Sequence, residues 1–331
     1  MTKPRYDVLC IGNAIVDVLA DANDAFLSKQ GLEKGSMHLI DEQQAVRLYG
    51  EMGPGREISG GSAGNTAAGL AALGLKAAFI GQVADDQLGN IYKHDIESQG
   101  IDFLVPARSD VGATARSLIL VTPDAQRTMN TFLGAAQMLE KESVDLAAVA
   151  DSGIVYLEGY LWDPAAPRAA MEAAIEAAHA AGRKVAFTLS DVFCVDRHRE
   201  GFWQLLKDGK VDILFANEAE AASMTKANDV EDAIAELAGV VPMLVVTRSE
   251  AGATAVAGAD RADVPAEPIE RLVDTTGAGD LFAAGFLAGQ ARGLSLEASL
   301  KLGAIAAAEV IQHYGARPEK DLRALAAGVL A

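Results

Sequence analysis

The sequence predicts an α/β fold, with a mostly parallel sheet covered by helices on both faces. Short, almost continuously apolar segments alternate along the chain with alanine-rich segments of helical character. Strands that are apolar on both faces are typical of a parallel sheet between two helical layers, and their alternation with helices is typical of doubly wound folds. The predicted buried strands are residues 6–12, 77–83, 152–159, 184–190, 211–217 and 242–248.

The helical character is clearest at residues 164–184, PAAPRAAMEAAIEAAHAAGRK. Met171, Ile175 and Ala178 form an apolar stripe at helical spacing, and Gly182 is placed as a stop signal. No low-complexity linker and no internal repeat divides the chain. We therefore expect a single domain over residues 1–331.

Two segments depart from this alternation. Residues 16–50 hold strand-like pieces around a helix-like stretch, and residues 112–134 alternate on both sides of Pro123-Asp124, which is a hairpin signal. We expect the two segments to assemble into a small separate sheet that acts as a lid over a substrate. Surface decoration is the alternative.

The composition limits the partners and the compartment. The chain has 331 residues, half of them hydrophobic, and a net charge of −18, which disfavours nucleic acid and anionic lipid as partners. Two cysteines, Cys10 and Cys194, fit a reducing compartment. The apolar N-terminal run is interrupted by Asn13 and Asp17, well short of the roughly 18 residues that a membrane span needs. We expect a cytoplasmic protein, monomeric or homodimeric, that acts on a small molecule.

Residues 274–286, DTTGAGDLFAAGF, predict a tight turn that leads into a helix. The N-terminus of a helix has unpaired N–H donors and a partial positive charge, and glycine lets an anion approach the backbone closely. Asp280 would lie in the first helical turn, beside that anion. A proton acceptor next to a site of developing negative charge is what phosphoryl transfer to an alcohol requires. Helix capping by Asp280 is the structural alternative.

Other cofactor and phosphate sites lack their signatures. There is no GxxxxGK[ST] segment for a P-loop. The first strand is followed by GNAIVD rather than GxGxxG, which counts against a nicotinamide or flavin cofactor. The histidines and cysteines show no metal-ligand spacing.

A second small-residue stretch, SGGSAGNTAAGLAALG, covers residues 59–74. Gly60 and Gly61 would let the backbone close on a polar ligand that Asn65 hydrogen-bonds, although a tightly packed helix entrance is the alternative. Asp17, which we expect at the end of the first strand, is an ionisable group in an apolar segment. A hydroxyl-bearing ligand would account for it, because a buried carboxylate without a partner is costly.

These stretches together resemble the PfkB carbohydrate-kinase family, the ribokinase-like kinases. GGSAGNTAAGLAALGLKAAFIGQVADDQLG resembles the N-terminal signature of the family, and DTTGAGDLFAAGFLAG resembles its C-terminal signature. The resemblance covers essentially the whole chain. It implies a three-layer α/β/α sandwich with a small β-sheet lid, and transfer of the γ-phosphate of ATP to a sugar or nucleoside hydroxyl with Mg²⁺. It leaves open a monovalent cation such as K⁺.

The resemblance also implies roles for individual residues. Asp280 corresponds to the general base, and Gly277, Ala278 and Gly279 correspond to the anion hole. A non-enzymatic sensor on the same fold would be expected to lose this base.

For the nucleotide, the resemblance implies that Asn217 and Glu220 in NEAE orient magnesium and the phosphates, Glu220 through a water molecule. From the residues alone, a strand end with a helix cap is an equal alternative. Residues 303–316, with Ala307, resemble the wall on the adenine side. The segment VTRSEAG resembles a turn for nucleotide phosphate that contains Thr247, Ser249, where glycine is common, and Gly252.

The acceptor is expected to be adenosine, phosphorylated at its 5′-hydroxyl. GNAIVD, AFLSKQGLEKGSMHLID and QRTMNTFLGAA resemble segments of nucleoside kinases of the adenosine type. Glu158 in YLEGYLW instead resembles a sugar-contacting glutamate of ribokinases, so that a ribokinase- or fructokinase-type sugar kinase is the alternative.

We expect Asp17 to bind ribose hydroxyls, Asn13 and Asn65 to bind the ribose or the base, and Arg127 to reach the phosphate. A nucleoside also needs an apolar slot for its base. Core packing is the alternative for the walls that we propose for this slot, Leu39, Phe132, Leu161 and Trp162.

Overall fold

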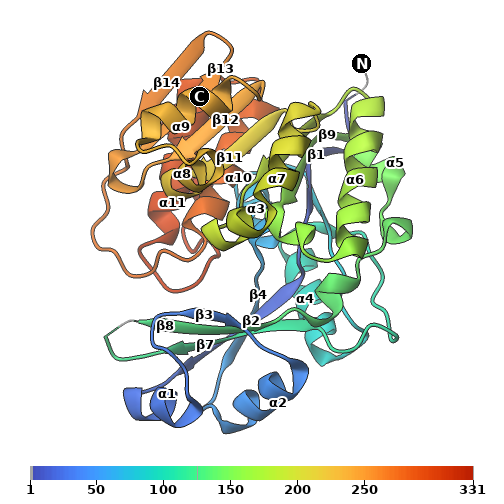
Figure 1. Cartoon of the computed structure of the whole chain (residues 1–331), viewed down its shortest axis with the longest axis vertical. Helices are drawn as coiled ribbons and strands as arrows, with labels where there is room; N and C mark the ends of the chain where they lie inside the picture. Colours follow the sequence, from blue (N-terminus) through green and yellow to red (C-terminus); the bar gives the residue numbers. More distant parts are fainter. Residues whose placement is uncertain (1–2, 125, 331) are drawn as a thin grey trace.

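The computed structural model describes residues 3–124 and 126–330, which form two sheets of unequal size (Figure 1). The larger sheet has nine strands in the order β14-β13-β12-β11-β10-β9-β1-β5-β6. It is parallel from β12 to β6, and only β13 and β14 run antiparallel to their neighbours. The strands are β1 (Tyr6–Ile11), β5 (Ala77–Ile80), β6 (Asp102–Phe103), β9 (Ser152–Glu158), β10 (Lys184–Thr188), β11 (Ile213–Asn217), β12 (Met243–Thr247), β13 (Ala253–Ala257) and β14 (Asp260–Val264).

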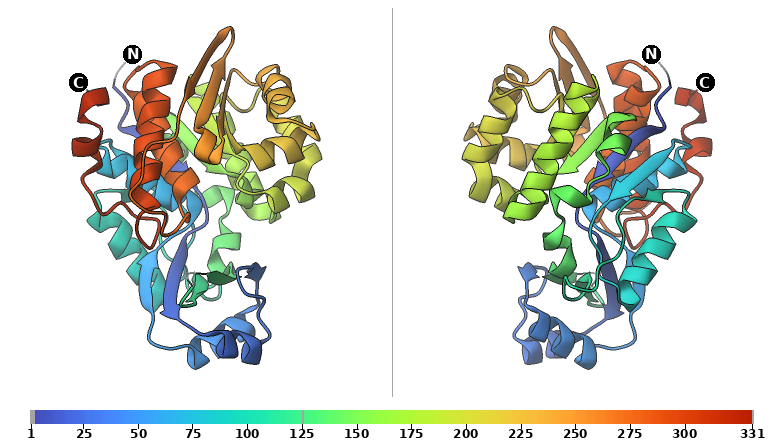
Figure 2. Two further views of the ribbon diagram at one scale, coloured as in Figure 1. Left: turned by 90° about the vertical axis from the view of Figure 1, so that its left-hand side faces the viewer. Right: turned by 90° about the vertical axis from the view of Figure 1, so that its right-hand side faces the viewer.

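Helices cover both faces of this sheet, which confirms the predicted three-layer α/β/α sandwich (Figure 2). Successive side chains of β1 enter different cores, Val8 and Cys10 on one face and Leu9 and Ile11 on the other. This explains why the strand is apolar at nearly every position. One core includes α3 (Ser62–Ala72), α4 (Gln87–Ser98), α10 (Ala278–Ala291), α11 (Leu296–Val310) and α12 (Leu322–Leu325), with α13 (Ala327–Leu330) against it; the other includes α5 (Leu146–Ala150), α6 (Ala165–Ala180), α7 (Val192–Lys207), α8 (Glu218–Thr225) and α9 (Val230–Ala238).

All six predicted strands are present as β1, β5, β9, β10, β11 and β12. The helix predicted at 164–184 is α6. Its apolar stripe of Met171, Ile175 and Ala178 is buried, and Gly182 follows the helix with a φ of +67°.

The smaller sheet has the strand order β3-β8-β7-β2-β4. The two irregular segments contribute four of its strands, and 112–134 forms the expected antiparallel hairpin around a turn in which residue 125 lies outside the described residues. The fifth strand falls beyond the boundaries that we predicted. The strands are β2 (Ile15–Asp21), β3 (Met37–Leu39), β4 (Arg56–Ser59), β7 (Ala115–Val121) and β8 (Arg127–Phe132).

The two faces of the small sheet differ in what covers them. The helices α1 (Asp24–Gln30) and α2 (Glu42–Glu51) pack on the outer face (Figure 1). Leu27 and Leu48 of these helices belong to the same core cluster as Val18 and Leu118 of the sheet. The inner face lies toward the large sheet. Cross-strand pairing places both charged and apolar side chains there: Ile15, Asp17, Leu19, Asp21, Met37, Leu39, Arg56, Ile58, Ala115, Ser117, Ile119, Val121, Arg127, Met129 and Thr131.

Asp17 does not end the first strand, as we had expected. β1 ends at Ile11, and the chain crosses between the sheets at residues 12–14, so that Asp17 lies within β2. Within the described residues, no helix has the length and apolar character needed to cross a membrane.

Candidate active site

Asp280 lies in the first turn of α10, beside the edge of the large sheet where parallel strands end. Glu158 and Thr188 are paired at the ends of β9 and β10, and Asn217 and Thr247 are paired at the ends of β11 and β12. The carboxyl ends of strands in an open α/β sheet are the usual place for a ligand. The predicted residues for base and nucleotide therefore come from one edge of the sheet.

The carboxylate of Asp280 is held by the first turns of α3. Ser62 Oγ donates to Oδ1 at 2.7 Å, and Asn65 Nδ2 donates to Oδ2 at 2.8 Å. Burial raises the pKa of Asp280, whereas the hydrogen bonds from Asn65 and Ser62 and the positive charge of Arg317 oppose that rise. Neither carboxylate oxygen caps α10, whose N-cap residue is Gly277. The side chain of Asp280 therefore does not cap α10 by a hydrogen bond.

The turn before α10, the anion turn (residues 274–277), has the geometry expected of an anion site. Gly277 adopts a φ of +79°, which favours glycine, and a Cβ there would lie 2.5 Å from the Cβ of Ala316. Gly279 is exposed, and a Cβ on it would meet no atom within 4 Å. The helix has 14 residues, and its N-terminus therefore presents a positive dipole end beside open space at Gly279.

Arg127 connects the small sheet to this turn. Its Nη1 donates to Thr276 Oγ1 at 2.9 Å, and its Nη2 lies 2.6 Å from Asp274 Oδ2 in a pair of largely buried side chains. Its guanidinium also lies 5.6 Å from the ring centroid of Tyr314. The residue predicted to reach a phosphate is thus next to the anion turn, although its present partner is a carboxylate.

Asp17 projects from β2 against the bend between β4 and α3. A Cβ on Gly60 would collide with its carboxylate, which explains the glycine at that position. Burial raises the pKa of Asp17 to about 7, while Arg317 and Arg127 act in the opposite direction. Among the described residues, none donates a hydrogen bond to this carboxylate, so that both oxygens can accept from a ligand.

The absence of a side chain at Gly60 and Gly61 makes room for neighbouring atoms of the same chain rather than for a ligand. Gly61 has a φ of +80°, and a Cβ there would collide with the carbonyl oxygen of Asn13. The tightly packed helix entrance is thus the arrangement found. Asn13 and Asn65 border the same bend and are each 5% exposed, and Asn65 Oδ1 has no hydrogen-bond partner among the described residues.

Glu158, for which the resemblance implied a contact with the sugar, faces the backbone of its own chain. The side chain is fully buried, and its two oxygens accept from the backbone N–H groups of Asn13 and Ala63, each at 2.8 Å. Burial raises the pKa of Glu158 to about 7. Its carboxylate therefore joins the loop after β1 to the start of α3 and has no surface to offer a substrate.

Asn217 and Glu220 form a reciprocal capping box at the start of α8. Glu220 N donates to Asn217 Oδ1 at 2.8 Å, and Glu220 accepts from Asn217 N at 3.0 Å and from Asn217 Nδ2 at 2.6 Å. Burial raises the pKa of Glu220 to about 7. The cap is present, and each carboxylate oxygen keeps a second lone pair for a water molecule.

The other nucleotide-side predictions fall on neighbouring elements. Thr247 ends β12, opposite Asn217, and Ser249 begins a short 3₁₀ turn with a φ of +49°. Gly252 has a φ of +91°, and a Cβ there would collide with the carbonyl of Val264. Gly252 is therefore required by the backbone conformation and the close packing of the β12–β13 turn. Ala307 is partly buried in α11, whose side chains pack in the core shared with α10.

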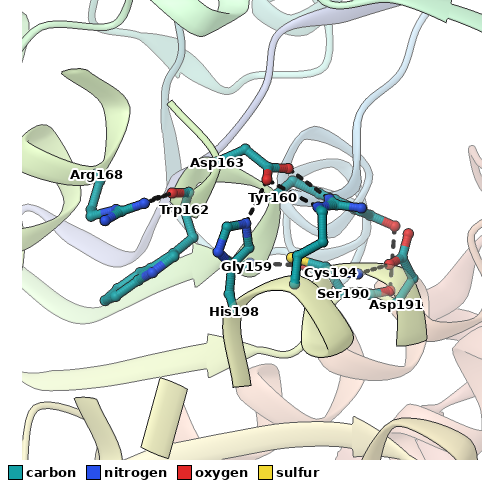
Figure 3. A network of polar contacts seen from close by, with 10 residues as sticks. Gly159, Tyr160, Trp162, Asp163, Arg168, Ser190, Asp191, Cys194 and His198 are labelled. Atoms are coloured by element: carbon teal, nitrogen blue, oxygen red, sulfur yellow. Dashed lines mark hydrogen bonds and ion pairs between the residues drawn. The ribbon is translucent and has the colours of Figure 1, made fainter. Parts of the chain in front are cut away.

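The four predicted walls of a base slot do not come together. Leu39 is 58% exposed and shares the inner face of the small sheet with Asp17, whereas Phe132 pairs with Arg116 on the opposite face. Leu161 and Trp162 belong to the core that also contains side chains of α6 and α7. Figure 3 shows Trp162 beside Arg168, which donates to its carbonyl.

Trp162 is held in that core by its surroundings. Its ring lies edge-on to Phe202 with centroids 5.6 Å apart, and its carbonyl accepts from Arg168 Nη2 at 2.6 Å. The cavity of about 350 Å³ that it lines lies between α6 and α7. The core-packing alternative is therefore correct for Leu161 and Trp162.

Sequence reasoning missed three residues that build this site. Ser62 donates to Asp280, Asp274 holds the anion turn by accepting from Thr276 N at 3.0 Å, and Arg317 donates to the bend before α3. A serine three residues before Asn65 carries little signal by itself. Asp274 begins the motif at residues 274–286, but its partners Thr276, Gly315 and Arg127 are brought to it only by the fold.

Comparison with known proteins gives consistent matches. The family model described as pfkB family carbohydrate kinase matches residues 37–322. The adenosine kinase of Saccharomyces cerevisiae is 27% identical over an alignment of 339 positions, which covers 95% of this chain and 96% of that protein. The fructoselysine 6-kinase of Escherichia coli is 31% identical over 272 residues, which cover 82% of this chain and 95% of that protein.

Solved structures match over nearly the full length. The adenosine kinase from Sinorhizobium meliloti has a TM-score of 0.91 and 51% identity, covering 99% of this chain and 100% of its own. A probable sugar kinase from Rhizobium etli has a TM-score of 0.93 and 49% identity, covering 98% of this chain and 99% of its own. The protein belongs to the pfkB family of carbohydrate kinases and is an ATP-dependent phosphotransferase.

Proposed function

We propose that this kinase transfers the γ-phosphoryl group of ATP to the 5′-hydroxyl of adenosine, with AMP and ADP as products. The observation that carries the proposal is the position of Asp280. Its carboxylate lies at the N-terminus of α10, beside the open space at Gly279, and is oriented by Ser62 and Asn65. A base and an anion site therefore adjoin one position for a reacting oxygen.

In the proposed reaction, the acceptor oxygen attacks the γ-phosphorus while the bond to the bridging oxygen of ADP breaks. Asp280 takes the hydroxyl proton. The negative charge on the transferred group meets the N–H groups at the start of α10 and the guanidinium of Arg127, which needs to exchange its contact with Asp274 for the phosphate. Catalysis of this kind rests on positioning and charge, with little covalent chemistry.

The small sheet supports a nucleoside rather than a free sugar as acceptor. Asp17 shares the inner face with apolar side chains that include Leu19, Ile58 and Ile119, and with the charged side chains of Asp21, Arg56 and Arg127. A cavity of about 700 Å³ adjoins this face, and its lining includes apolar and aromatic side chains (Leu19, Ile58, Val121 and Tyr314) as well as the charged side chains of Asp21 and Arg56. Ribose hydroxyls would bind Asp17 and Asn65 Oδ1, and the base would cover the apolar surface, which a free pentose leaves wet.

We also propose that the small sheet acts as the lid. Its contact with the rest of the site through Arg127 would exclude water, which competes with the hydroxyl for the phosphoryl group. The segments concerned are 16–50 and 112–134, with β4 added.

Magnesium fits the residues present as an ion held mainly by phosphate oxygens and water. Within the described residues, no cluster of three or more His, Cys, Asp or Glu side chains could hold a metal ion, and Mg²⁺ commonly binds through few protein ligands. When bound, it would neutralise phosphate charge. We propose that Glu220, with Asn217, would hold one of its waters.

Removal of divalent cations is therefore expected to stop ADP formation without unfolding the protein. Excess chelator should abolish activity, and added Mg²⁺ should restore it. The melting temperature of the nucleotide-free protein should stay unchanged, because no protein cage depends on the metal. Full activity in chelator would contradict the role of the ion.

The variant Asp17→Ala is expected to raise the KM for the acceptor by about tenfold or more, because hydrogen bonds from ribose hydroxyls to a charged group are lost. kcat should also fall, since the acceptor is less well oriented. The matched control is Asp24→Ala, which removes an exposed carboxylate from α1 on the other side of the same sheet. Equal effects of the two variants would show that Asp17 does not bind the acceptor.

The acceptor is tested by kcat/KM for ADP release with adenosine, other nucleosides, ribose and fructose. Adenosine should give the highest value. The sugar-kinase alternative is favoured by the matches to the fructoselysine kinase and the probable sugar kinase. A higher value for ribose or fructose would establish that alternative.

A further inference from the structure

Arg317 binds the bend that carries the partners of Asp280. Its Nε and Nη2 donate to the carbonyl of Ser59 at 3.0 and 2.8 Å, Nη2 also reaches Ser59 Oγ at 2.8 Å, and Nη1 donates to the carbonyl of Gly64 at 2.6 Å. Ser59 ends β4, and Gly64 lies between Ser62 and Asn65 in the first turn of α3. The guanidinium fork therefore fixes both ends of the bend.

The residues just before Arg317 contact the anion turn, which precedes Asp280. Gly315 N donates to Asp274 Oδ2 at 3.1 Å, and Ala316 packs where a Cβ on Gly277 would stand. The loop of residues 311–321 thus contacts both the anion turn and the bend before α3, the two segments that set the position of Asp280.

Arg317 is a partly buried cation among acidic groups from several elements. Ser59 N donates to Asp95 Oδ2 at 3.0 Å, and Ser59 Oγ also bonds that oxygen, so that Ser59 links Arg317 to a carboxylate of α4. Arg317 opposes the rise that burial causes in the pKa of both Asp17 and Asp280. The ionisable groups that face this region are Asp17 from β2, Tyr92 and Asp95 from α4, Arg127 from β8, Asp274 from the anion turn and Asp280 from α10.

We propose that Arg317 is a positioning residue of the phosphoryl transfer, which fixes the bend at residues 59–65 beside Asp280 and supplies a partly buried positive charge next to the acceptor site. The proposal rests on the role of Asp280 as the base. Arg317 acts through other groups, since its donors bind two backbone carbonyls and a serine hydroxyl. A purely structural cross-link would affect stability and leave the pH dependence of the reaction unchanged.

The test compares Arg317→Gln, which removes the charge, with Arg317→Lys. Lysine keeps the charge but lacks the branched guanidinium that binds Ser59 and Gly64 at the same time. The matched control is Arg292→Gln. Arg292 joins the far end of α10 to α3 by similar bonds, with Nη2 donating to the carbonyl of Leu73 at 2.7 Å and Nη1 to that of Ala288 at 3.1 Å. kcat/KM is measured between pH 6 and 9 with the acceptor that the wild-type protein uses best.

In Arg317→Gln, the ratio of kcat/KM at pH 8.5 to that at pH 6.0 is expected to rise by about tenfold or more, because the base is protonated more readily at low pH. Arg317→Lys should keep the wild-type ratio with a lower kcat. Arg292→Gln should lower the melting temperature and keep the ratio.

A wild-type ratio in Arg317→Gln overturns the proposal, as does an equally raised ratio in Arg317→Lys. If Arg317→Gln does not fold, a wild-type kcat in Arg317→Lys overturns it. These outcomes are independent of the acceptor, because the best acceptor is used whether it is a nucleoside or a sugar. An active Asp280→Asn protein would instead refute the base on which the proposal rests.

Discussion

Asp280→Asn is expected to lower kcat by about 10²-fold or more while the protein stays folded. Asparagine keeps the size of the side chain but cannot accept the hydroxyl proton. Ser62 and Asn65 can still hydrogen-bond its amide, so that the contact between α10 and α3 persists. Single-turnover kinetics and thermal unfolding of the same preparation measure both quantities.

The pH dependence of the wild-type protein provides the internal control for this variant. Because burial raises the pKa of Asp280, activity should fall as the pH drops toward the ordinary range of a carboxyl group. That decline should be absent from the residual activity of Asp280→Asn. Near-normal turnover in the variant would mean that another group, or water, removes the proton.

Gly279→Val is expected to reduce kcat by about 10²–10³-fold or more, the size of effect seen when one oxyanion donor is lost. A side chain at this position would extend into space that no protein atom occupies within 4 Å, where we place the transferred phosphoryl group. The substitution should therefore block the reaction without disturbing the fold. kcat is measured together with the melting temperature.

Gly277→Val is the matched control for this steric argument. Gly277 has a positive φ and lies against Ala316, so that valine there should lower the melting temperature as well as the activity. If Gly279→Val keeps wild-type activity, the phosphates bind elsewhere and the anion site at α10 is wrongly placed.

The central strands were predictable because their burial on both faces leaves a continuous apolar run. Strands without that pattern were missed. β4 (REIS) carries two charged residues, and β14 (DRADV) is a largely exposed edge strand, so that neither differs from a loop in composition. The position of Asp17 was wrong for a different reason. The crossing between the two sheets takes only residues 12–14, so that Asp17 lies close in sequence to the end of β1 although it belongs to a strand of the other sheet.

In the candidate site, too, some residues could be predicted from the sequence and others could not. Asp280 and its turn could be predicted because the signal is local, a glycine-rich turn before a helix. The function of Glu158 could not, because a carboxylate at a strand end has the same sequence pattern whether it meets a ligand or backbone N–H groups. Arg317 gave no signal at all, since its partner Gly64 is 253 residues away along the chain.

Product analysis with adenosine tests the central claim most directly. Purified protein is mixed with Mg²⁺, ATP and either adenosine or 5′-deoxyadenosine, and the nucleotides are separated and identified. We predict equal amounts of ADP and AMP from adenosine, with the new phosphate on the 5′-oxygen, and no ADP above background from 5′-deoxyadenosine. Absence of AMP with adenosine, together with ADP formation on a free sugar, would contradict the account.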